Sequence, residues 1–424
     1  MQLVAYGAQD VYLTGNPKVT FFQAVYKRHT NFAMENIEQV VNGSAGNSGR
    51  LSVTIARNGD LIGNMYLDLV TIAPATGLDK CWAAERAVQD IELTIGGQRI
   101  DKHYQRWWRL YAELYLDEAK KANWGKMTSD VVAGTNRVVL PLIFFFNRNP
   151  GLYLPLIGLQ YHEVRLDIDL SAEFTRYFST SGVKVWGNYV YLDTDERRRF
   201  AQKGHEYLIE QVQHTGADSI GNTTSAKQVR LSYNHPVKEL VWCFNNTKSS
   251  GADAQANELW NFTSNVAHSN VVVDLPTASS GENYVAPGQM GAPQVLVGGT
   301  HSNRPIVEKA ESTTSVTGGP LKTFKLILNG QDRFKEQPGS YFNEVQPYYH
   351  HSGNPMGGVY AYSFALKPED HQPTGTCNFS RIDNAQVEVT PKYALDTSGI
   401  MSMFAVNYNV LRIQSGMGGL AFSN

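Results

Sequence analysis

The pattern of apolar and polar positions changes period within one stretch, Ile91–Tyr115. Residues alternate between apolar and polar from Ile91 to Ile95, which is typical of a half-buried strand. Gly96 and Gly97 break this strand, and apolar residues then recur at the three- and four-residue spacing of one helix face. The stretch therefore predicts a strand, a turn and an amphipathic helix. The helix face consists of Tyr104, Trp107, Trp108, Tyr111, Leu114 and Tyr115.

The same unit returns in the second half of the chain, at Phe324–Tyr348. Two further segments of the first half also have counterparts, in the same order and at similar offsets. Three such pairings indicate an internal duplication. The pairs are Gly97-Gln98 with Gly330-Gln331, Val164–Ile168 with Ala385–Val389, and Asn188-Tyr189 with Asn407-Tyr408.

Most of the remaining chain consists of short apolar runs between turn signals. Helical patterns do not alternate with strands, so a parallel α/β fold is disfavoured and an all-β sandwich or jelly roll is favoured. Asn58-Gly59-Asp60 predicts a hairpin turn between two of the strands. The predicted strands are Val19–Arg28, Leu51–Ala56, Leu61–Ile72, Arg137–Phe146, Leu159–Leu170, Val183–Leu192, Val229–Asn234, Glu239–Phe244, Leu321–Leu328, Val359–Leu366, Ala385–Val389 and Met403–Ile413.

At 424 residues the chain is longer than one hydrophobic core usually supports. We expect an N-terminal arm at residues 1–17, a first domain at 18–199 and a second at 200–424. The charged run Asp193–Phe200 predicts a solvated linker between the domains. Pro276–Pro320 is rich in Gly, Ser, Thr and Pro, and predicts a long surface excursion on the outward side of the second domain.

Val138–Leu159 is the one apolar stretch that resembles a membrane span, but prolines and polar residues interrupt it. It predicts two buried strands joined by a turn at Asn147–Gly151. No signal peptide is expected, because Met1–Asp10 lacks a basic segment followed by a long apolar one. The net charge of −2 argues against a protein that mainly neutralises phosphates. Cys81, Cys243 and Cys377 are too far apart for a zinc site, and reduced thiols are expected.

Motifs for cofactors, metals and catalysis are weak. Gly416–Ala421 matches a dinucleotide fingerprint, but the chain ends at Asn424, before a helix can follow. No P-loop is present, because Gly125-Lys126 is followed by Met127. Neither a nucleophile elbow nor a paired acid and base stands out. We therefore expect no cofactor and no metal.

Two groups of residues could form a functional site, but each also fits a purely structural role. Asp167, Asp169, Asp193 and Asp195 could hold a metal, but the pattern favours solvated surface, and the adjacent His350 and His351 would point to opposite faces of a strand. The segment Arg106–Arg109, with two tryptophans between arginines, could stack on single-stranded nucleic acid. Its helical spacing instead favours packing of Trp107 and Trp108 on a sheet, with the two arginines beside the stripe.

Five N-x-S/T sequons are candidate N-glycosylation sites, and their number is near chance. Without a signal peptide they do not imply secretion. The asparagines are Asn42, Asn222, Asn245, Asn261 and Asn378.

Long segments from one end of the chain to the other resemble the major capsid proteins of nucleocytoplasmic large DNA viruses, particularly those of the chlorella-virus (phycodnavirus) type. Gly7–Ala33 carries the resemblance most strongly. The other segments are Ile95–Tyr104, Pro141–Val164, His205–Gln211, Leu328–Phe334, Tyr362–Ala385 and Asn407–Asn424.

This resemblance implies two consecutive eight-stranded antiparallel jelly rolls with short helices in loops, and no enzyme activity. It further implies a homotrimeric capsomer of pseudo-hexameric outline that tiles an icosahedral shell, assembled in the host cytoplasm. The expected partners are neighbouring capsomers, penton and minor capsid proteins, with an internal membrane on the inner side and no direct contact with nucleic acid. Receptor or glycan contact is expected outside. A lectin-like jelly-roll module and a β-sandwich glycan hydrolase remain the alternatives.

Overall fold

The structure is a computed structural model that describes residues 7–72, 82–129, 137–245, 271–273, 306–308, 319–355, 357–392 and 399–422. The excursion expected at residues 276–320 lies almost entirely outside these ranges, as do Cys81 and Asn261.

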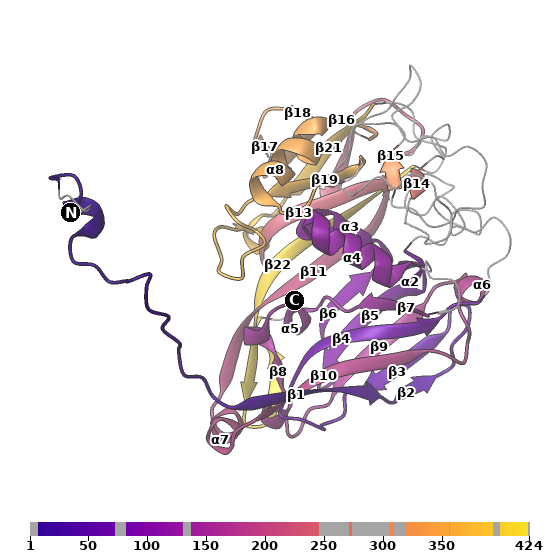
Figure 1. Ribbon diagram of the computed structural model, residues 1–424. Helices are drawn as coiled ribbons and strands as arrows, with labels where there is room; N and C mark the ends of the chain where they lie inside the picture. The colour runs from indigo at the N-terminus through magenta and orange to yellow at the C-terminus, as the bar shows by residue number, and fades with distance from the viewer. Residues whose placement is uncertain are drawn as a thin grey trace, which may run out of the picture.

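Two antiparallel sheets built from the first half of the chain face each other and enclose a core (Figure 1). One sheet has the strand order β1-β10-β4-β7, with β8 attached to β4, and the other has the order β2-β3-β9-β5-β6. The bounds are β1 Phe32–Gln39, β2 Val41–Gly43, β3 Arg50–Thr54, β4 Leu61–Val70, β5 Val88–Ile95, β6 Gln98–Tyr104, β7 Arg137–Pro141, β8 Leu154–Pro155, β9 Val164–Leu170 and β10 Lys184–Leu192.

The second half repeats this construction around its own core. One sheet has the order β11-β22-β13-β19, with β20 and β23 at its margins, and the other has the order β12-β21-β16-β17, with β18 on β16. A separate pair is formed by β14 and β15. The bounds are β11 His205–Ser219, β12 Lys227–Leu231, β13 Pro236–Asn245, β14 Val271–Val273, β15 Ile306–Glu308, β16 Leu321–Leu328, β17 Gln331–Asp332, β18 Gln337–Pro338, β19 Val359–Ser363, β20 Cys377–Asn378, β21 Ala385–Pro391, β22 Ile400–Gln414 and β23 Met417–Leu420.

Short helices occupy the connections between strands. The longest, α3 and α4, lie together between β6 and β7. The bounds are α1 Val11–Thr14, α2 Ala83–Arg86, α3 Gln105–Tyr115, α4 Glu118–Thr128, α5 Phe145–Arg148, η1 Pro150–Leu152, η2 Leu156–Gly158, α6 Phe174–Tyr177, α7 Thr194–Gln202, η6 Tyr341–Val345, α8 Gln346–His350 and η7 Phe379–Arg381.

The strand orders of the two halves match one to one. The sheet β1-β10-β4-β7 corresponds to β11-β22-β13-β19, and β3-β9-β5-β6 corresponds to β12-β21-β16-β17. The three segment pairs found in the sequence fall on the turns after β5 and β16, on β9 and β21, and on β10 and β22. In the part of the chain that the structure describes, each half thus has eight matching strands. The internal duplication and the double jelly roll are confirmed.

The hairpin turns at the two duplicated strands have the same left-handed backbone. Gly96 and Gly97 have φ values of 58° and 83°, and Asn329 and Gly330 have 52° and 77°. Positive φ at both central residues fits the type I′ turn that a two-residue hairpin prefers. The first hairpin has an additional constraint, because a Cβ on Gly96 would lie 2.3 Å from the ring of His162.

Several predicted strands are absent or shortened, among them Leu159–Leu170, which begins only at Val164, and two others differ more strongly from the prediction. Val19–Arg28 is exposed chain without strand structure, and the first strand begins only at Phe32. Among the described residues no strand pairs with this apolar stretch. Arg137–Phe146 is a strand only to Pro141, because the Asn147 side chain accepts a hydrogen bond from Phe144 N, at 3.2 Å, and donates to Gly63 O, at 2.8 Å, which fixes the helical turn α5.

Three connections also differ from the predictions. Asn58-Gly59-Asp60 joins β3 to β4, which lie in different sheets, so it is a crossover and not a hairpin. The second strand predicted within Val138–Leu159 shrinks to the two residues of β8 between helical turns. No helix among the described residues is long and apolar enough to cross a membrane. The charged linker is solvated as expected, but it forms the helix α7, which has no buried residue.

Gly96→Ala should destabilise the protein more than the neighbouring substitution Gly97→Ala. Both residues have positive φ, which costs an alanine about 1–2 kcal/mol. Only at Gly96 must the new methyl group also displace the His162 ring, since a Cβ on Gly97 meets nothing within 4 Å. We expect about 1–3 kcal/mol of additional loss at Gly96, measured by denaturant unfolding. Equal losses for the two variants would contradict this account of the turn.

Candidate functional site

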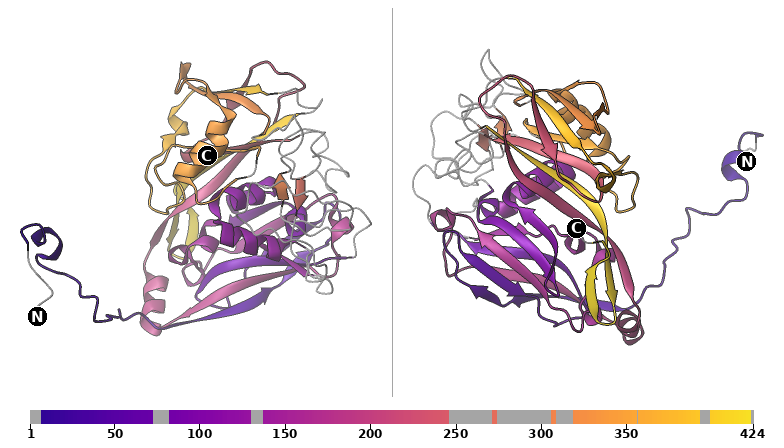
Figure 2. Two further views of the ribbon diagram at one scale, coloured as in Figure 1. Left: turned by 45° about the horizontal axis from the view of Figure 1, so that its top comes forward. Right: turned by 180° about the vertical axis from the view of Figure 1, so that it is seen from behind.

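The two jelly rolls meet across the sheet β11-β22-β13-β19, which contributes apolar side chains to both cores. Alternate residues of a strand point to opposite faces. Leu240 and Trp242 accordingly belong to the second core, whereas Val241, Phe404 and Val406 pack into the core of the first roll. Figure 2 shows this sheet between the rest of the second roll and the first roll. The first roll is therefore a structural cover for the second.

Helix α3 provides part of that cover. It lies at the junction of the two rolls (Figure 1), and the Trp107 ring centroid is 5.7 Å from that of Phe404. Trp107 and Trp108 are both buried, with Trp108 in the core of the first roll. The prediction that these tryptophans pack on a sheet is confirmed.

The arginines that flank the tryptophans differ from each other. Arg106 is half-buried, whereas Arg109 is fully buried. The sequence pattern predicted both arginines beside the apolar stripe and did not indicate that Arg109 is buried. The Nη atoms of Arg109 lie 3.4 Å from Glu85 Oε1 and 3.2 Å from Glu113 Oε1, and its guanidinium stacks 3.8 Å from the centroid of the Trp82 ring. Burial raises the pKa of Glu85 against the opposing effect of Arg109. The Arg109 guanidinium is therefore used for ion pairing and packing in the protein interior.

An ionic cluster links the two rolls. Glu210 of β11 lies 2.7 Å from Arg148 Nη2 of α5 and 2.6 Å from Lys238 Nζ of β13. Burial would raise the pKa of Glu210, but Arg148 and Lys238 together hold it below its ordinary value. Lys238 also donates to Pro368 O at 2.5 Å, and burial lowers its pKa. Breaking such a buried cluster leaves uncompensated charge, so it fixes how the rolls sit together.

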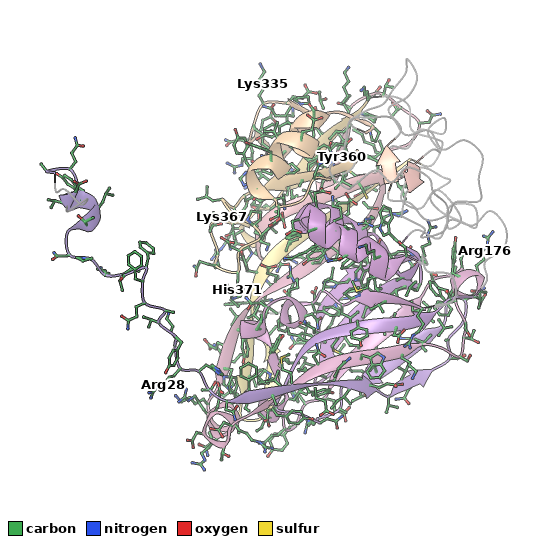
Figure 3. The ribbon with its side chains drawn as sticks, viewed as in Figure 1. Arg28, Arg176, Lys335, Tyr360, Lys367 and His371 are labelled. Carbon is green, nitrogen blue, oxygen red and sulfur yellow. The ribbon has the colours of Figure 1, made fainter. Side chains whose placement is uncertain are left out.

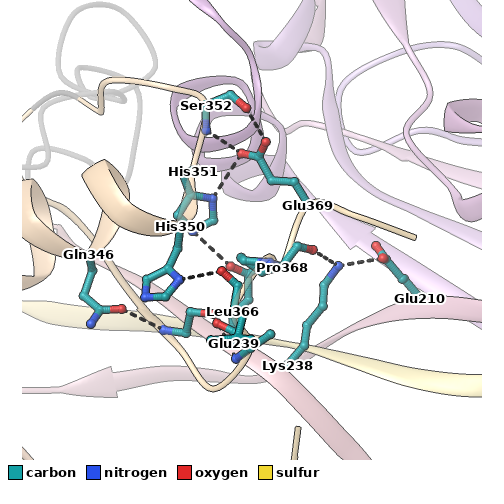
Figure 4. A network of polar contacts seen from close by, with 12 residues as sticks. Glu210, Lys238, Glu239, Gln346, His350, His351, Ser352, Leu366, Pro368 and Glu369 are labelled. Atoms are coloured by element: carbon teal, nitrogen blue, oxygen red, sulfur yellow. Dashed lines mark hydrogen bonds and ion pairs between the residues drawn. The ribbon is translucent and has the colours of Figure 1, made fainter. Parts of the chain in front are cut away.

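A second cluster surrounds His351, just after α8 (Figure 4). Its Nε2 lies 3.1 Å from Glu239 Oε2, and its Nδ1 lies 3.4 Å from Glu369 Oε1. Burial opposes a charge on this imidazole, but Glu239 and Glu369 outweigh burial and raise the pKa of His351 to about 9. The neighbouring His350 has a different partner, since its Nδ1 lies 3.0 Å from Leu366 O.

The His351 cluster belongs to the roll–roll contact. The Tyr115 ring of α3 approaches the His351 ring, with centroids 5.3 Å apart. Gly353 N donates to Leu114 O at 2.9 Å, and Lys121 Nζ of α4 donates to Asn354 O at 2.6 Å. His351 and its two carboxylate partners thus lie beside the segment that makes these contacts.

A polar groove of about 560 Å³ opens where the edge strand β6 of the first roll faces β11 of the second. Side chains join these two strands: Val212 N donates to Asp101 Oδ1 at 3.0 Å, and Gln211 Nε2 donates to Ile100 O. Arg99 and His214 are among the lining residues. No sequence pattern indicates this groove, because its walls come from strands more than 100 residues apart.

The N-terminal segment stands away from both rolls. It includes α1 and extends to the start of β1, and Figure 3 shows Arg28 on it, close to the point where it leaves the body. Phe21 and Phe22 are 92% and 99% exposed. Exposed apolar side chains that lie close together are typical of surfaces that contact other molecules.

The sequons do not form one site among the described residues. Asn42 lies on β2, Asn222 in the β11–β12 connection and Asn378 on β20, and all three are exposed. Asn378 Oδ1 accepts a hydrogen bond from Ser380 N at 3.1 Å. The side chain of Asn245, at the end of β13, and all of Asn261 lie outside the described residues.

The remaining candidate motifs have structural roles. Gly416 follows Ser415 in a left-handed hairpin turn that leads into the strand β23, so the glycine-rich end of the chain is a hairpin. Asp167 was expected to be solvated, but it is buried, because Arg165 covers it with an ion pair of 2.7 Å. Asp193 and Asp195 are exposed at the start of α7.

Burial raises the pKa of the Cys243 thiol to about 12. Across the described ranges, no group of His, Cys, Asp and Glu is arranged to hold a metal ion.

Two family models together match nearly the whole chain. A model for the N-terminal part of major capsid proteins matches residues 20–193, and one for the large eukaryotic DNA virus major capsid protein matches residues 196–419. The chain belongs to this capsid protein family. Its place is the capsid of the virion, where it assembles with other capsid proteins into a shell.

Curated relatives cover the full length of the chain. The major capsid protein of Paramecium bursaria Chlorella virus 1 is 43% identical over 461 residues, covering 100% of this chain and 99% of the relative. That of Pyramimonas orientalis virus is 40% identical over 464 residues, with the same coverage. The lectin-like alternative finds no support among these relatives.

Solved structures of viral capsid proteins match the fold of this chain. The quasi-atomic model of the PBCV-1 virus capsid matches with a TM-score of 0.74 and 40% identity, covering 96% of this chain and 100% of that one. The Faustovirus major capsid protein matches with a TM-score of 0.70 at 13% identity, covering 96% and 94%, which shows a shared fold alone.

The His351 cluster should make stability decline at alkaline pH. The pKa of His351 is raised from about 6.5 to about 9 by folding, so its contribution is complete below about pH 6.5 and is lost as pH rises through about 9. We expect the free energy of unfolding to fall by up to roughly 3 kcal/mol across this window. Urea unfolding at pH 6 to 10 measures it.

The variant His351→Gln should show a flatter pH dependence of stability. The control variant His350→Gln should keep the wild-type pH dependence, because His350 makes no contact with Glu239. A wild-type profile that is as flat as that of His351→Gln between pH 7 and 9.5 would refute the assignment.

Proposed function

We propose that the chain forms a homotrimeric capsomer of pseudo-hexameric outline that tiles an icosahedral shell. The observation that supports it is the matching strand order of the two rolls. Three chains that each carry two similar rolls can present six similar units around a threefold axis.

We further propose that the two rolls are the units 18–199 and 200–424, joined near α7. The strands of the first two sheets fall within residues 32–192 and those of the next two within 205–420, which supports this division. Within this first unit the strands begin only at β1, and the described residues 7–31 contain no strand, so residues 18–31 continue the arm along the chain and add nothing to the sheets of the roll.

The role we propose is structural, without enzymatic activity and without a cofactor. This rests on the relatives, which are capsid proteins, and on the buried charges of the junction, which pair with one another. No direct contact with nucleic acid is proposed, because the basic aromatic segment of α3 is used for packing.

The proposed partners are neighbouring capsomers, penton proteins and minor capsid proteins, with the arm on the inner side, towards an internal membrane. The exposed aromatic residues of the arm support such contacts. The opposite, outer surface is proposed to meet host receptor or glycans. Asn42, Asn222 and Asn378 are accessible if the host attaches glycans at sequons.

Purified protein should sediment as a trimer of three times 47.1 kDa. Electron microscopy should show particles with a hexagonal outline, because six similar rolls surround the axis. A stable monomer at micromolar concentration would contradict the proposal, and a monomer that bound sugars would favour the lectin-like alternative.

Deleting residues 1–16 should impair assembly of trimers into ordered arrays and leave the trimer intact. The reason is that the described part of this segment lies outside both cores. Sedimentation would measure the trimer, and electron microscopy the arrays. The variant Tyr161→Ser, which removes an exposed aromatic residue elsewhere, serves as the control and should assemble. Loss of soluble trimer on deletion would argue against an arm that acts only between capsomers.

A further inference from the structure

Each roll carries a helical segment at the same place in its topology, and the two segments are used differently. In the first roll α3 follows β6, and in the second roll η6 and α8 follow β18 at the corresponding sheet edge. Each segment is anchored in its own core by a large aromatic residue. These anchors are Trp108, which is fully buried, and Phe342, whose ring centroid is 5.3 Å from that of Trp242.

Two helical turns beyond each anchor, the segments present aromatic rings. In α3 that residue is Tyr115, and it meets the second roll of the same chain at His351. In α8 it is Tyr349, which is 71% exposed, beside Tyr348, which is 80% exposed. The rings of Tyr348 and Tyr349 pack edge to face, with centroids 5.1 Å apart. Both rings are therefore held together at the surface, and most of their area is left uncovered by the described residues.

The surface that receives α3 also has a counterpart. Trp107 of α3 packs on Phe404, which is paired in register with Val241 on the outward face of the sheet β11-β22-β13-β19. On the matching sheet of the first roll, Trp186 is paired in register with Tyr66 between β10 and β4.

These two aromatic residues point away from the first core, because Val185 and Leu67, their neighbours along the strands, are buried in it. Trp186 and Tyr66 are half-buried. Local contacts hold them in place: Lys184 Nζ lies 5.9 Å from the Trp186 ring centroid, and Asn36 Nδ2 donates to Tyr66 Oη at 2.7 Å. The first roll thus carries a preformed aromatic face that corresponds to the one covered in the second roll.

We propose that the Tyr348 and Tyr349 face of α8 docks on the Trp186 and Tyr66 face of a second copy of this chain. The contact resembles the one within the chain, where α3 of the first roll lies on the outward sheet of the second roll. It differs in the residues used, because within the chain Trp107 meets that sheet and Tyr115 meets His351. It rests on the proposed trimer and specifies which surfaces close it. Tyrosine and tryptophan are the residues that most often dominate such interfaces.

The test uses two full-length variants that are co-expressed with different tags, Tyr349→Cys in one copy and Trp186→Cys in the other. Both carry Cys81→Ser and Cys377→Ser, which remove the other thiols except the buried Cys243. A short bismaleimide should cross-link one copy of each type. Each variant alone, and Tyr161→Cys paired with Trp186→Cys, should give no cross-link.

A trimeric preparation without the Tyr349–Trp186 cross-link overturns the docking surface and leaves the proposed function standing. A wild-type protein that never forms trimers overturns both. The double variant Tyr348→Ser with Tyr349→Ser gives a second measurement, and its trimer should dissociate at a concentration at least about tenfold higher than wild type. The Tyr161→Ser control should dissociate as wild type does, and an unchanged trimer in the double variant also overturns the surface.

Discussion

The structure depends on one sheet that must be covered on both faces. Strands β11, β22, β13 and β19 send alternate side chains into two different cores. Exposing Val241, Phe404 and Val406 to water would cost about 2 kcal/mol for each large side chain. Stabilities of whole domains are only about 5–15 kcal/mol. The second roll is therefore dependent on the first, and the two rolls behave as one folded unit although the chain encodes each as a separate repeat.

The polar groups of the junction act on geometry more than on affinity. Burying charges such as Glu210, Lys238 and Arg148 is unfavourable unless each finds its partner. The cluster is satisfied only when α5 of the first roll and β11 of the second are in one relative position. Apolar packing tolerates small slides between surfaces, whereas these ion pairs do not. Together with the His351 cluster, these ion pairs fix the angle between the two rolls, which apolar packing alone would leave variable. A shell subunit needs such a fixed angle if every copy is to present the same outline.

The sequence predicts much of this because the repeats are local patterns. The change of period at Gly96-Gly97, the buried tryptophans of α3 and the duplicated β9 and β21 segments all follow from neighbours in the chain. Errors arise where a partner is distant or absent. Val19–Arg28 has the pattern of a strand but no sheet to join, and β11 was missed because its polar Glu210 and Gln211 are satisfied by residues of the first roll. One error has a near partner: the pattern predicts Asp167 at the surface, because it cannot show that the side chain of Arg165, two residues away, lies over it.

The unequal fate of the two copies explains why a duplication persists with divergent halves. A helical segment that docks on the next roll is a head-to-tail contact, and such contacts either close into a ring or continue as a filament. Because two rolls are joined in one chain, every second contact between successive rolls of the ring forms within a chain. The aromatic residues of that contact, such as Trp107 and Tyr115, therefore become part of the core. The alternate contact remains between chains and must stay soluble until assembly, which favours tyrosine over larger apolar residues at Tyr348 and Tyr349. Divergence of α8 from α3 is then the expected consequence of one contact forming during folding and the other after it.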